Sequence, residues 1–162
     1  MLYIHKLRDS NVIDFAAEEL KKYLRMMMPQ ENQITIAADP AATTGFRLGL
    51  LEDFGMPNPA PDPVMDDIVH IDTTQSGGIL AGSNPRSVLF AVYRFLKLNG
   101  CRFLFPGIDG EHIPRQKIQP QSYHKMADHQ MRGHSLEGDP SLQQVLSYID
   151  WHAKEELNCF GC

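Results

Sequence analysis

The chain has 162 residues, 43% of them hydrophobic and 22% charged, which is the composition of an ordinary globular protein. This length suffices for one domain with a core, or for one domain and a piece of another. The formal net charge of −5 and the scattered Lys and Arg residues argue against a nucleic-acid partner. No apolar run approaches ~20 residues, so no membrane partner is expected.

The N-terminus, MLYIHKLRDS, has no charged segment followed by an apolar core, so it carries no visible secretion signal. We therefore expect a cytoplasmic protein, although a chain trimmed of its leader would look the same. Residues 2–6 alternate as a short strand does. Residues 12–28 then predict a helix, with capping residues at Ser10 and Asn11 and a stop at Pro29.

The next segment predicts strands separated by one long loop. Residues 33–38 and 45–50 have the composition of strands. The stretch 52–67 is rich in proline and predicts an irregular surface loop. Residues 67–72 and 78–81 then predict the two arms of a hairpin.

The most regular segment is 77–106, with the sequence GGILAGSNPRSVLFAVYRFLKLNGCRFLFP. It predicts a strand, a turn, a helix and a second strand. Asn84 is a good N-cap, Pro85 suits the first helical position, and Gly100 can close the helix in a left-handed conformation. The apolar positions that recur at helical spacing include Val88, Val92, Phe95 and Leu96. Residues 101–105 then alternate as a strand.

The character of the chain changes after Met126. A polar stretch leads into the segment 132–138, RGHSLEG, and Asp139 with Pro140 predicts the start of a third helix. The expected apolar face of that helix consists of Leu142, Val145, Leu146, Ile149 and Ala153. Residues 157–160 predict entry into another strand. Together these elements form one βα unit and the opening of a second, which is too little for a separate domain.

The predicted order gives a two-layer α/β fold, with residues 117–123 as a late strand. We expect a mixed β-sheet that carries two long helices on one face, followed by a truncated βα unit.

Several segments, in this order, resemble a known family. They are FAAEELKKYLRMM, ILAGSNPRSVLFAVYRFLKLNGCRFLFPG with IDGEHIP just after it, and SYIDWHAKEELNCF. They are similar to the N-terminal accessory domain of α-glucuronidase-like glycoside hydrolases, and to related uncharacterised proteins with such a domain ahead of a catalytic barrel. A similar domain precedes the barrel of β-N-acetylhexosaminidases. The stretch 82–107 is the most distinctive part of the resemblance.

The resemblance implies two parts and a division of labour. Residues 1–122 would be the accessory α/β domain, and residues 123–162 the beginning of a truncated (β/α)₈ barrel. The catalytic acid and base of the family lie on later strands, so no catalytic residue is expected in this chain and the chain alone should be inactive. The whole protein would act on an oligosaccharide or polysaccharide, without a cofactor.

Three residues are candidates for contact with the sugar: Arg132, His134 and Glu137. Arg132 has the planar, two-pronged geometry that binds a carboxylate. Glu137 follows a predicted strand of the barrel, and Asp139 is better explained as a helix N-cap. The competing interpretation of all three is ordinary loop polarity or salt bridging at a strand end.

Other site types are less well supported by the sequence. His124, His129 and His134 are spaced by five residues, which suits neither a helix face nor a strand face, so no metal site is expected. Gly77, Gly78 and Gly82 precede a helix, but their spacing matches no phosphate-binding motif, and turn glycines are the better explanation. Of the three cysteines, Cys159 and Cys162 form a C-x-x-C without a second pair to complete a zinc site.

Two further expectations concern the alternatives. Residues 1–122 could instead be a free-standing carbohydrate-binding or protein-interaction module. The apolar face of the third helix would lack its covering strands, so that helix should fold back on the first domain, be disordered, or pair with another copy in a homo-oligomer.

Overall fold

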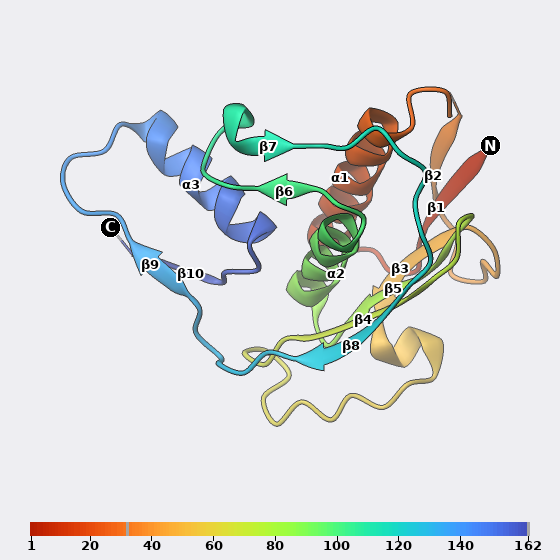
Figure 1. Cartoon of the computed structure of the whole chain (residues 1–162). Helices are drawn as coiled ribbons and strands as arrows, with labels where there is room; N and C mark the ends of the chain where they lie inside the picture. Colours follow the sequence, from red (N-terminus) through yellow and green to blue (C-terminus); the bar gives the residue numbers. More distant parts are fainter. Residues whose placement is uncertain (32, 162) are drawn as a thin grey trace.

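The computed structural model describes residues 1–31 and 33–161, and it has an α/β fold built on a six-stranded mixed sheet (Figure 1). The sheet consists of β1 (Leu2–Lys6), β2 (Ile34–Ala38), β3 (Phe46–Leu50), β4 (Ile68–Thr73), β5 (Gly78–Gly82) and β8 (Gln121–Met126), in the order β2-β1-β3-β5-β4-β8. The first four strands of this order are parallel, whereas β4 pairs antiparallel with both β5 and β8. The predicted fold class is confirmed.

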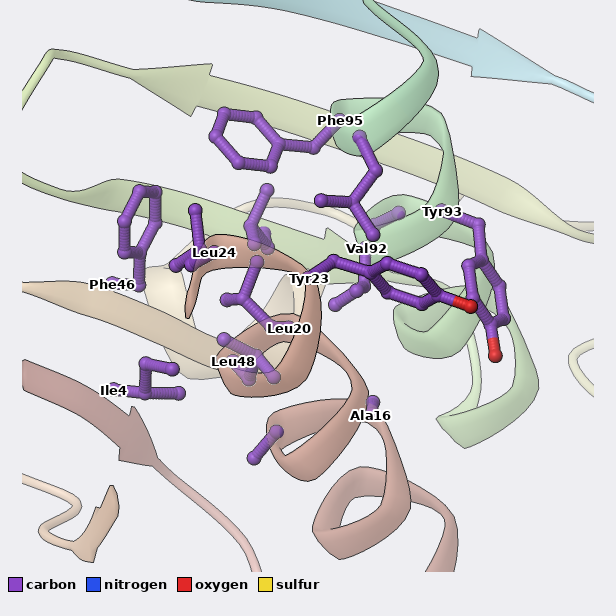
Figure 2. Close-up of a cluster of buried hydrophobic side chains, with 14 of the residues drawn as sticks. Ile4, Ala16, Leu20, Tyr23, Leu24, Phe46, Leu48, Val92, Tyr93 and Phe95 are labelled. Atoms are coloured by element: carbon purple, nitrogen blue, oxygen red, sulfur yellow. The ribbon is translucent and has the colours of Figure 1, made fainter. Parts of the chain in front are cut away.

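Two long helices, α1 (Asn11–Met27) and α2 (Pro85–Leu98), lie side by side on one face of this sheet (Figure 1). Their apolar faces meet the strands in one large buried cluster, to which both layers contribute. Figure 2 shows Leu20 and Leu24 of α1 and Phe95 of α2 on the side of the cluster near Phe46 of β3, whereas Tyr23 lies beside Tyr93. The periodic spacing of apolar residues in both helices therefore serves the purpose that the sequence predicts, which is to cover one face of the sheet.

The opposite face of the sheet is covered only in part. The short helix η1 (Leu51–Phe54) and the proline-rich loop after it lie there (Figure 1). A small apolar cluster of Leu51, Ile68 and Ala81 joins this loop to the strands. Because side chains alternate along a strand, the remaining outward positions of β4 and β8 stay open on this face.

The start of α2 is built as the sequence predicts. Asn84 Oδ1 accepts a hydrogen bond from the Ser87 backbone N–H at 2.9 Å, and Pro85 occupies the first turn. At the other end Gly100 has a φ of 91°, a left-handed conformation that favours glycine. Gly82 lies where β5 and α2 approach so closely that a Cβ atom there would be 2.5 Å from Ser87.

Two predicted strands differ from the structure. The strand expected over residues 101–105 is only β6 (Arg102–Phe103), which pairs with β7 (Glu111–His112) after the short helix η2 (Ile108–Gly110). The late strand expected over 117–123 is β8, which runs to Met126. The expected domain boundary at residue 122 thus falls inside a strand of the main sheet, because β8 pairs with β4 along its whole length.

The last part of the chain forms a small βαβ unit. It consists of β9 (Gly133–Ser135), α3 (Leu142–Lys154) and β10 (Cys159–Gly161), and its two strands pair in parallel. Ser141 caps α3, with its side chain accepting from the Gln144 N–H. The expectation that Asp139 is the N-cap is wrong, because Pro140 and Ser141 still belong to the loop and the helix begins at Leu142.

Helix α3 folds back on the first unit, as one of the expectations had it, and Ala153 of the expected apolar face packs against the core together with Trp151. Trp151 Nε1 donates to the Phe103 carbonyl at 2.6 Å, and Lys154 Nζ donates to Glu111 Oε1 at 2.6 Å. Part of the expected apolar face remains in solvent: Leu142, Leu146 and Ile149 are about half exposed or more. The helix is therefore held by Trp151, Lys154 and Ala153 near its C-terminal end, and the rest of its aliphatic stripe contributes less.

Within residues 1–31 and 33–161, no helix is both long and apolar enough to cross a membrane.

Candidate functional site

The three predicted sugar-contact residues lie on or beside β9, but they do not converge on one site. Arg132 precedes the strand, His134 lies within it and Glu137 follows its end. Each has different surroundings. Arg132 links the βαβ unit to the first unit, which is the six-stranded sheet with α1 and α2. His134 lies against α3, and Glu137 faces solvent.

Arg132 links the last part of the chain to the main sheet. Its Nη2 donates to Asp67 Oδ2 at 2.6 Å, its Nη1 to the His129 carbonyl at 2.7 Å and its Nε to the Glu156 carbonyl at 3.1 Å. The guanidinium group also lies 5.7 Å from the centre of the Phe90 ring. All three nitrogens of the side chain thus have partners within the protein, so the prongs expected to bind a sugar carboxylate already bind a carboxylate of this chain.

Asp67 is the buried centre of this link and was not recognised in the sequence. Its Oδ1 accepts from Ser87 Oγ at 2.7 Å and forms an ion pair with Arg86 at 3.0 Å, while its Oδ2 accepts from Arg132. Burial by itself would raise the pKa of Asp67, but the hydrogen bonds from Arg132, Ser87 and Arg86 outweigh it and hold that pKa below its ordinary value. Asp67 is therefore a structural anion.

Asp67 occupies the place beside the start of α2 where a bound phosphate would otherwise lie. The N-terminal end of a helix attracts negative charge because its N–H groups and its dipole point there. In this protein the carboxylate of Asp67 lies beside the first turn and accepts hydrogen bonds from the side chains of Ser87 and Arg86. The side chain of Asn84 accepts the hydrogen bond of the buried Ser87 backbone N–H. The first turn is satisfied by the chain itself, which agrees with turn glycines rather than a phosphate site.

His134 packs under α3. Its ring contacts those of Tyr148 and Trp151 edge to face, and its Nε2 is 3.3 Å from the Nε2 of His152. His152 is buried, and its pKa is lowered first by that burial and then by the proximity of His134. The side chain of His134 therefore points toward the helix that covers β9, away from the other face of the small sheet.

Glu137 is the candidate whose side chain has no hydrogen-bond or ion-pair partner among the described residues. It is exposed just beyond the C-terminal end of β9, and its carboxylate makes no ion pair within residues 1–31 and 33–161. Asp139, which does not cap α3, lies exposed in the same loop. Two carboxylates therefore share one loop at the end of a parallel strand.

A polar cleft of about 200 Å³ lies between the main sheet and the end of α3. Arg132 and Asp67 form part of its wall, together with Arg94 and Glu156. Arg94 Nη2 donates to Glu156 Oε2 at 2.7 Å, and its guanidinium lies over the Tyr123 ring. The charges in this cleft are paired with one another, so its walls join the two units rather than offer free binding groups.

A larger cleft of about 550 Å³ lies at the far end of α1. Met27 at its edge is buried in the core, as expected for core filler, whereas Met26 is exposed. The polar side chains that line the cleft are those of Gln30, Glu31, Gln75, Arg115, Gln116 and Lys117. No aromatic ring lines it, so it lacks the flat surface on which a sugar ring stacks.

The histidines and cysteines form no metal centre of the usual kind. Among the described residues, no group of three or more His, Cys, Asp and Glu side chains is placed to hold a metal ion. Cys101 is buried, and burial raises the pKa of its thiol to about 12. Cys159 is half-buried with a free thiol, and Cys162 lies outside the described residues.

Comparison with models of known protein families gives no match for this chain, and no curated protein matches it significantly.

Proposed function

We propose that this chain is the N-terminal, non-catalytic part of a glycoside hydrolase of the α-glucuronidase-like type. Residues 1–126 would buttress a (β/α)₈ barrel, and β9, α3 and β10 would be the first strand, helix and second strand of that barrel. The general acid and base would lie on later strands, so this chain by itself would not cleave glycans. The substrate of the whole protein would be an oligosaccharide or polysaccharide.

The observation that carries this proposal is the parallel pairing of β9 with β10 across α3. The two strands are three residues long, and within residues 1–31 and 33–161 each pairs only with the other. Parallel strands joined by a helix occur almost only in larger sheets whose faces are covered, and an isolated two-stranded sheet is marginally stable. A βαβ unit with two free strand edges is therefore best explained as part of a larger parallel sheet.

The attachment of α3 to the first unit is a second observation in favour of a domain that supports the barrel. Lys154 is buried between Glu111 and Asp150 and forms ion pairs with both. Tyr23 of α1 donates to Glu111 at 2.8 Å, so this network reaches into the core of the first unit. This buried polar contact would fix the first helix of the barrel on the accessory domain.

The position of Glu137 agrees with a contact to the substrate. In barrels of parallel strands, ligands bind at the C-terminal ends of the strands. Glu137 and Asp139 follow the C-terminal end of β9, whereas His134 lies within it and faces α3. We accordingly retain Glu137 as a proposed binding residue, and we assign Arg132 and His134 to holding the unit together.

The direct test is to express the product of the complete reading frame and to assay it on aryl glycosides and on glucuronoxylan fragments. The proposal expects hydrolysis by that protein and none by the 162-residue chain. Either turnover by the chain alone, or a well-folded complete protein that cleaves none of these substrates, would contradict it.

Replacing Glu137 by Gln tests its role as a binding residue. In the complete protein, Glu137→Gln should raise KM at least about tenfold with a smaller change in kcat, since a hydrogen bond to a charged group contributes about 1.5–3 kcal/mol. Glu18→Gln, at an exposed position of α1, is the matched control and should change neither constant. An unchanged KM in Glu137→Gln would remove this residue from the site.

The alternative function is a carbohydrate-binding or protein-interaction module. The cleft of about 550 Å³ at the end of α1 is the feature that favours it, and its polar side chains would hold a sugar by hydrogen bonds rather than by stacking. Calorimetry of the 162-residue chain with xylo- and chito-oligosaccharides separates the two. Micromolar binding that is lost in Gln75→Ala would favour the module. Absence of heat favours the scaffold.

A further inference from the structure

Two histidines face each other on the open side of the sheet, far from β9. His70 of β4 and His124 of β8 are direct partners in the antiparallel register. Their Nδ1 atoms are 3.1 Å apart and their ring centres 5.3 Å apart. The pairing of neighbouring strands thus places two imidazoles together although 53 residues separate them in the chain.

The two rings lie on the face of the sheet that the helices do not cover. Val69 and Ile71, on either side of His70 in the sequence, belong to the core under α1 and α2. Alternation along β4 therefore points His70 to the opposite face, and Asp72 to the same face. His124 is exposed and His70 half-exposed, so solvent reaches the pair.

The separation of the two nitrogens fits a shared metal ion. A Zn²⁺ ion binds imidazole nitrogen at about 2.0–2.1 Å. Two such ligands are about 2.9 Å apart at a bond angle of 90° and about 3.4 Å apart at the tetrahedral angle, by simple trigonometry on that bond length. The observed 3.1 Å lies between these values. The same distance fits a single N–H···N hydrogen bond between the two rings when no ion is bound.

The charge of the surroundings suits a cation. Asp72 lies two residues from His70, on the same face of β4. Neutral imidazole is the form that binds metal ions. The carboxylate of Asp72 adds negative charge near the pair, and water can complete the coordination because this face is open.

We propose that His70 and His124 form a two-histidine binding site for a divalent transition-metal cation of the Zn²⁺ class, on the open face of the sheet. Imidazole ligands select Zn²⁺, Ni²⁺ and Cu²⁺ over Mg²⁺ and Ca²⁺. A bound ion would cross-link β8, the edge strand, to β4. It would thereby stabilise the strand that leads directly into the βαβ unit.

Calorimetric titration of the whole chain with ZnCl₂, and with MgCl₂ as the hard-cation control, tests the proposal. We expect one Zn²⁺ per chain, a rise in Tm on saturation, and no response to Mg²⁺. His124→Gln should weaken Zn²⁺ binding at least about tenfold and abolish most of the rise in Tm, because one of the two ligands is gone.

The matched control removes a histidine from the other close pair of rings. His134→Gln leaves His70 and His124 intact and should retain the Zn²⁺ affinity of the parent chain. Should His134→Gln lose the binding while His124→Gln keeps it, the ion belongs to the pair under α3 and the proposal is overturned. A parent chain that binds no Zn²⁺ at millimolar concentration overturns it as well.

A spectroscopic measurement covers the case in which a variant fails to fold. In the unmutated chain, Zn²⁺ should shift the imidazole nitrogen signals of His70 and His124 in NMR spectra and leave those of His112 and His129 in place. A shift confined to other histidines would contradict the proposal.

Discussion

Asp67 is the residue on which the connection between the two units depends. It is 2% exposed, yet it is surrounded by Arg86, Arg132 and three uncharged polar side chains, those of Asn84, Ser87 and Asn158. A buried charge is tolerated only when paired and hydrogen-bonded, and removing one partner exposes the others to the full cost of desolvation. The stability of this region should thus be unusually sensitive to a single carboxylate.

We predict that Asp67→Ala lowers the free energy of unfolding by about 3 kcal/mol, because two arginines then lose their buried partner. Asp128→Asn is the control: Asp128 pairs with Lys125 on the surface, where solvent screens the pair, so its loss should change the stability little. Urea unfolding of both variants measures the difference. Equal, small effects in the two variants would show that the Asp67 network is not stabilising.

The lowered pKa of Asp67 also gives a pH dependence. Because the folded-state pKa lies below the ordinary value of 3.8, the ionised form contributes stability at pH values above 3.8. That contribution disappears as the pH falls through the folded-state pKa. The difference in unfolding free energy between the parent chain and Asp67→Asn should therefore be constant near neutral pH and narrow below about pH 4. A difference that grows with acid would contradict the assignment.

Cys101 should be chemically inert in the folded protein. Burial raises the pKa of its thiol to about 12, and the thiolate is the reactive form. In a variant with Cys159→Ser and Cys162→Ser, the remaining thiol should react with a disulfide reagent only after unfolding in guanidinium. Rapid labelling of the native variant would show that the core around Cys101 opens easily.

At the scale of elements, the contact between β5 and α2 depends on Gly82. An added Cβ would lie 2.5 Å from both the backbone and the side chain of Ser87, so α2 would have to move away from the sheet. Gly82→Ala should lower the free energy of unfolding by about 1–3 kcal/mol, as overpacking does. In Gly161→Ala the new methyl group meets only ordinary contacts at 3.5 Å, and this control should change little.

The docking of α3 rests on Lys154. Replacing it with Ala leaves Glu111 buried without a cation, and we predict a loss of about 3–5 kcal/mol in the stability of the docked helix. The single tryptophan, Trp151, lies in the same contact and reports on it. Its emission should shift to longer wavelength in Lys154→Ala and stay unchanged in Leu142→Ala, which alters an exposed position of the same helix.

At the scale of the whole molecule, the six-stranded sheet with α1 and α2 has a continuous core, whereas the βαβ unit exposes part of its apolar surface. The main sheet has a continuous core under α1 and α2. The βαβ unit leaves two strand edges unpaired and part of an apolar stripe in solvent. Unpaired edges and apolar stripes favour association with further chain or with another copy. A supporting domain joined to the start of a barrel is consistent with this contrast.

The association of the chain with itself follows from the same exposed stripe. We expect the 162-residue chain to form homo-oligomers at high concentration, and Leu146→Lys to reduce them, since Leu146 is half exposed at the centre of the stripe. Sedimentation velocity over a range of concentrations measures this. A monomer at every concentration would contradict the expectation.

The sequence by itself determined the elements that depend on local patterns. Spacing, caps and turn residues predict several of the elements. These are the helices α1 and α2, the cap at Asn84, the hairpin of β4 and β5, and the strand–helix–strand order of the last forty residues. These features are readable because they depend on neighbours within a few positions along the chain. The two misplaced strands and the cap at Ser141 show how far such patterns reach, since strand ends and loop lengths are set by pairing partners.

Only the tertiary structure decided what the polar residues do. Arg132 is a plausible ligand for a sugar carboxylate until Asp67, 65 positions away, is found bonded to it. His124 has no useful neighbour at five-residue spacing, and yet its cross-strand partner is His70. The reason is physical: a charged or imidazole side chain is defined by the groups that surround it in space, and strand pairing and helix docking bring those groups from distant parts of the chain.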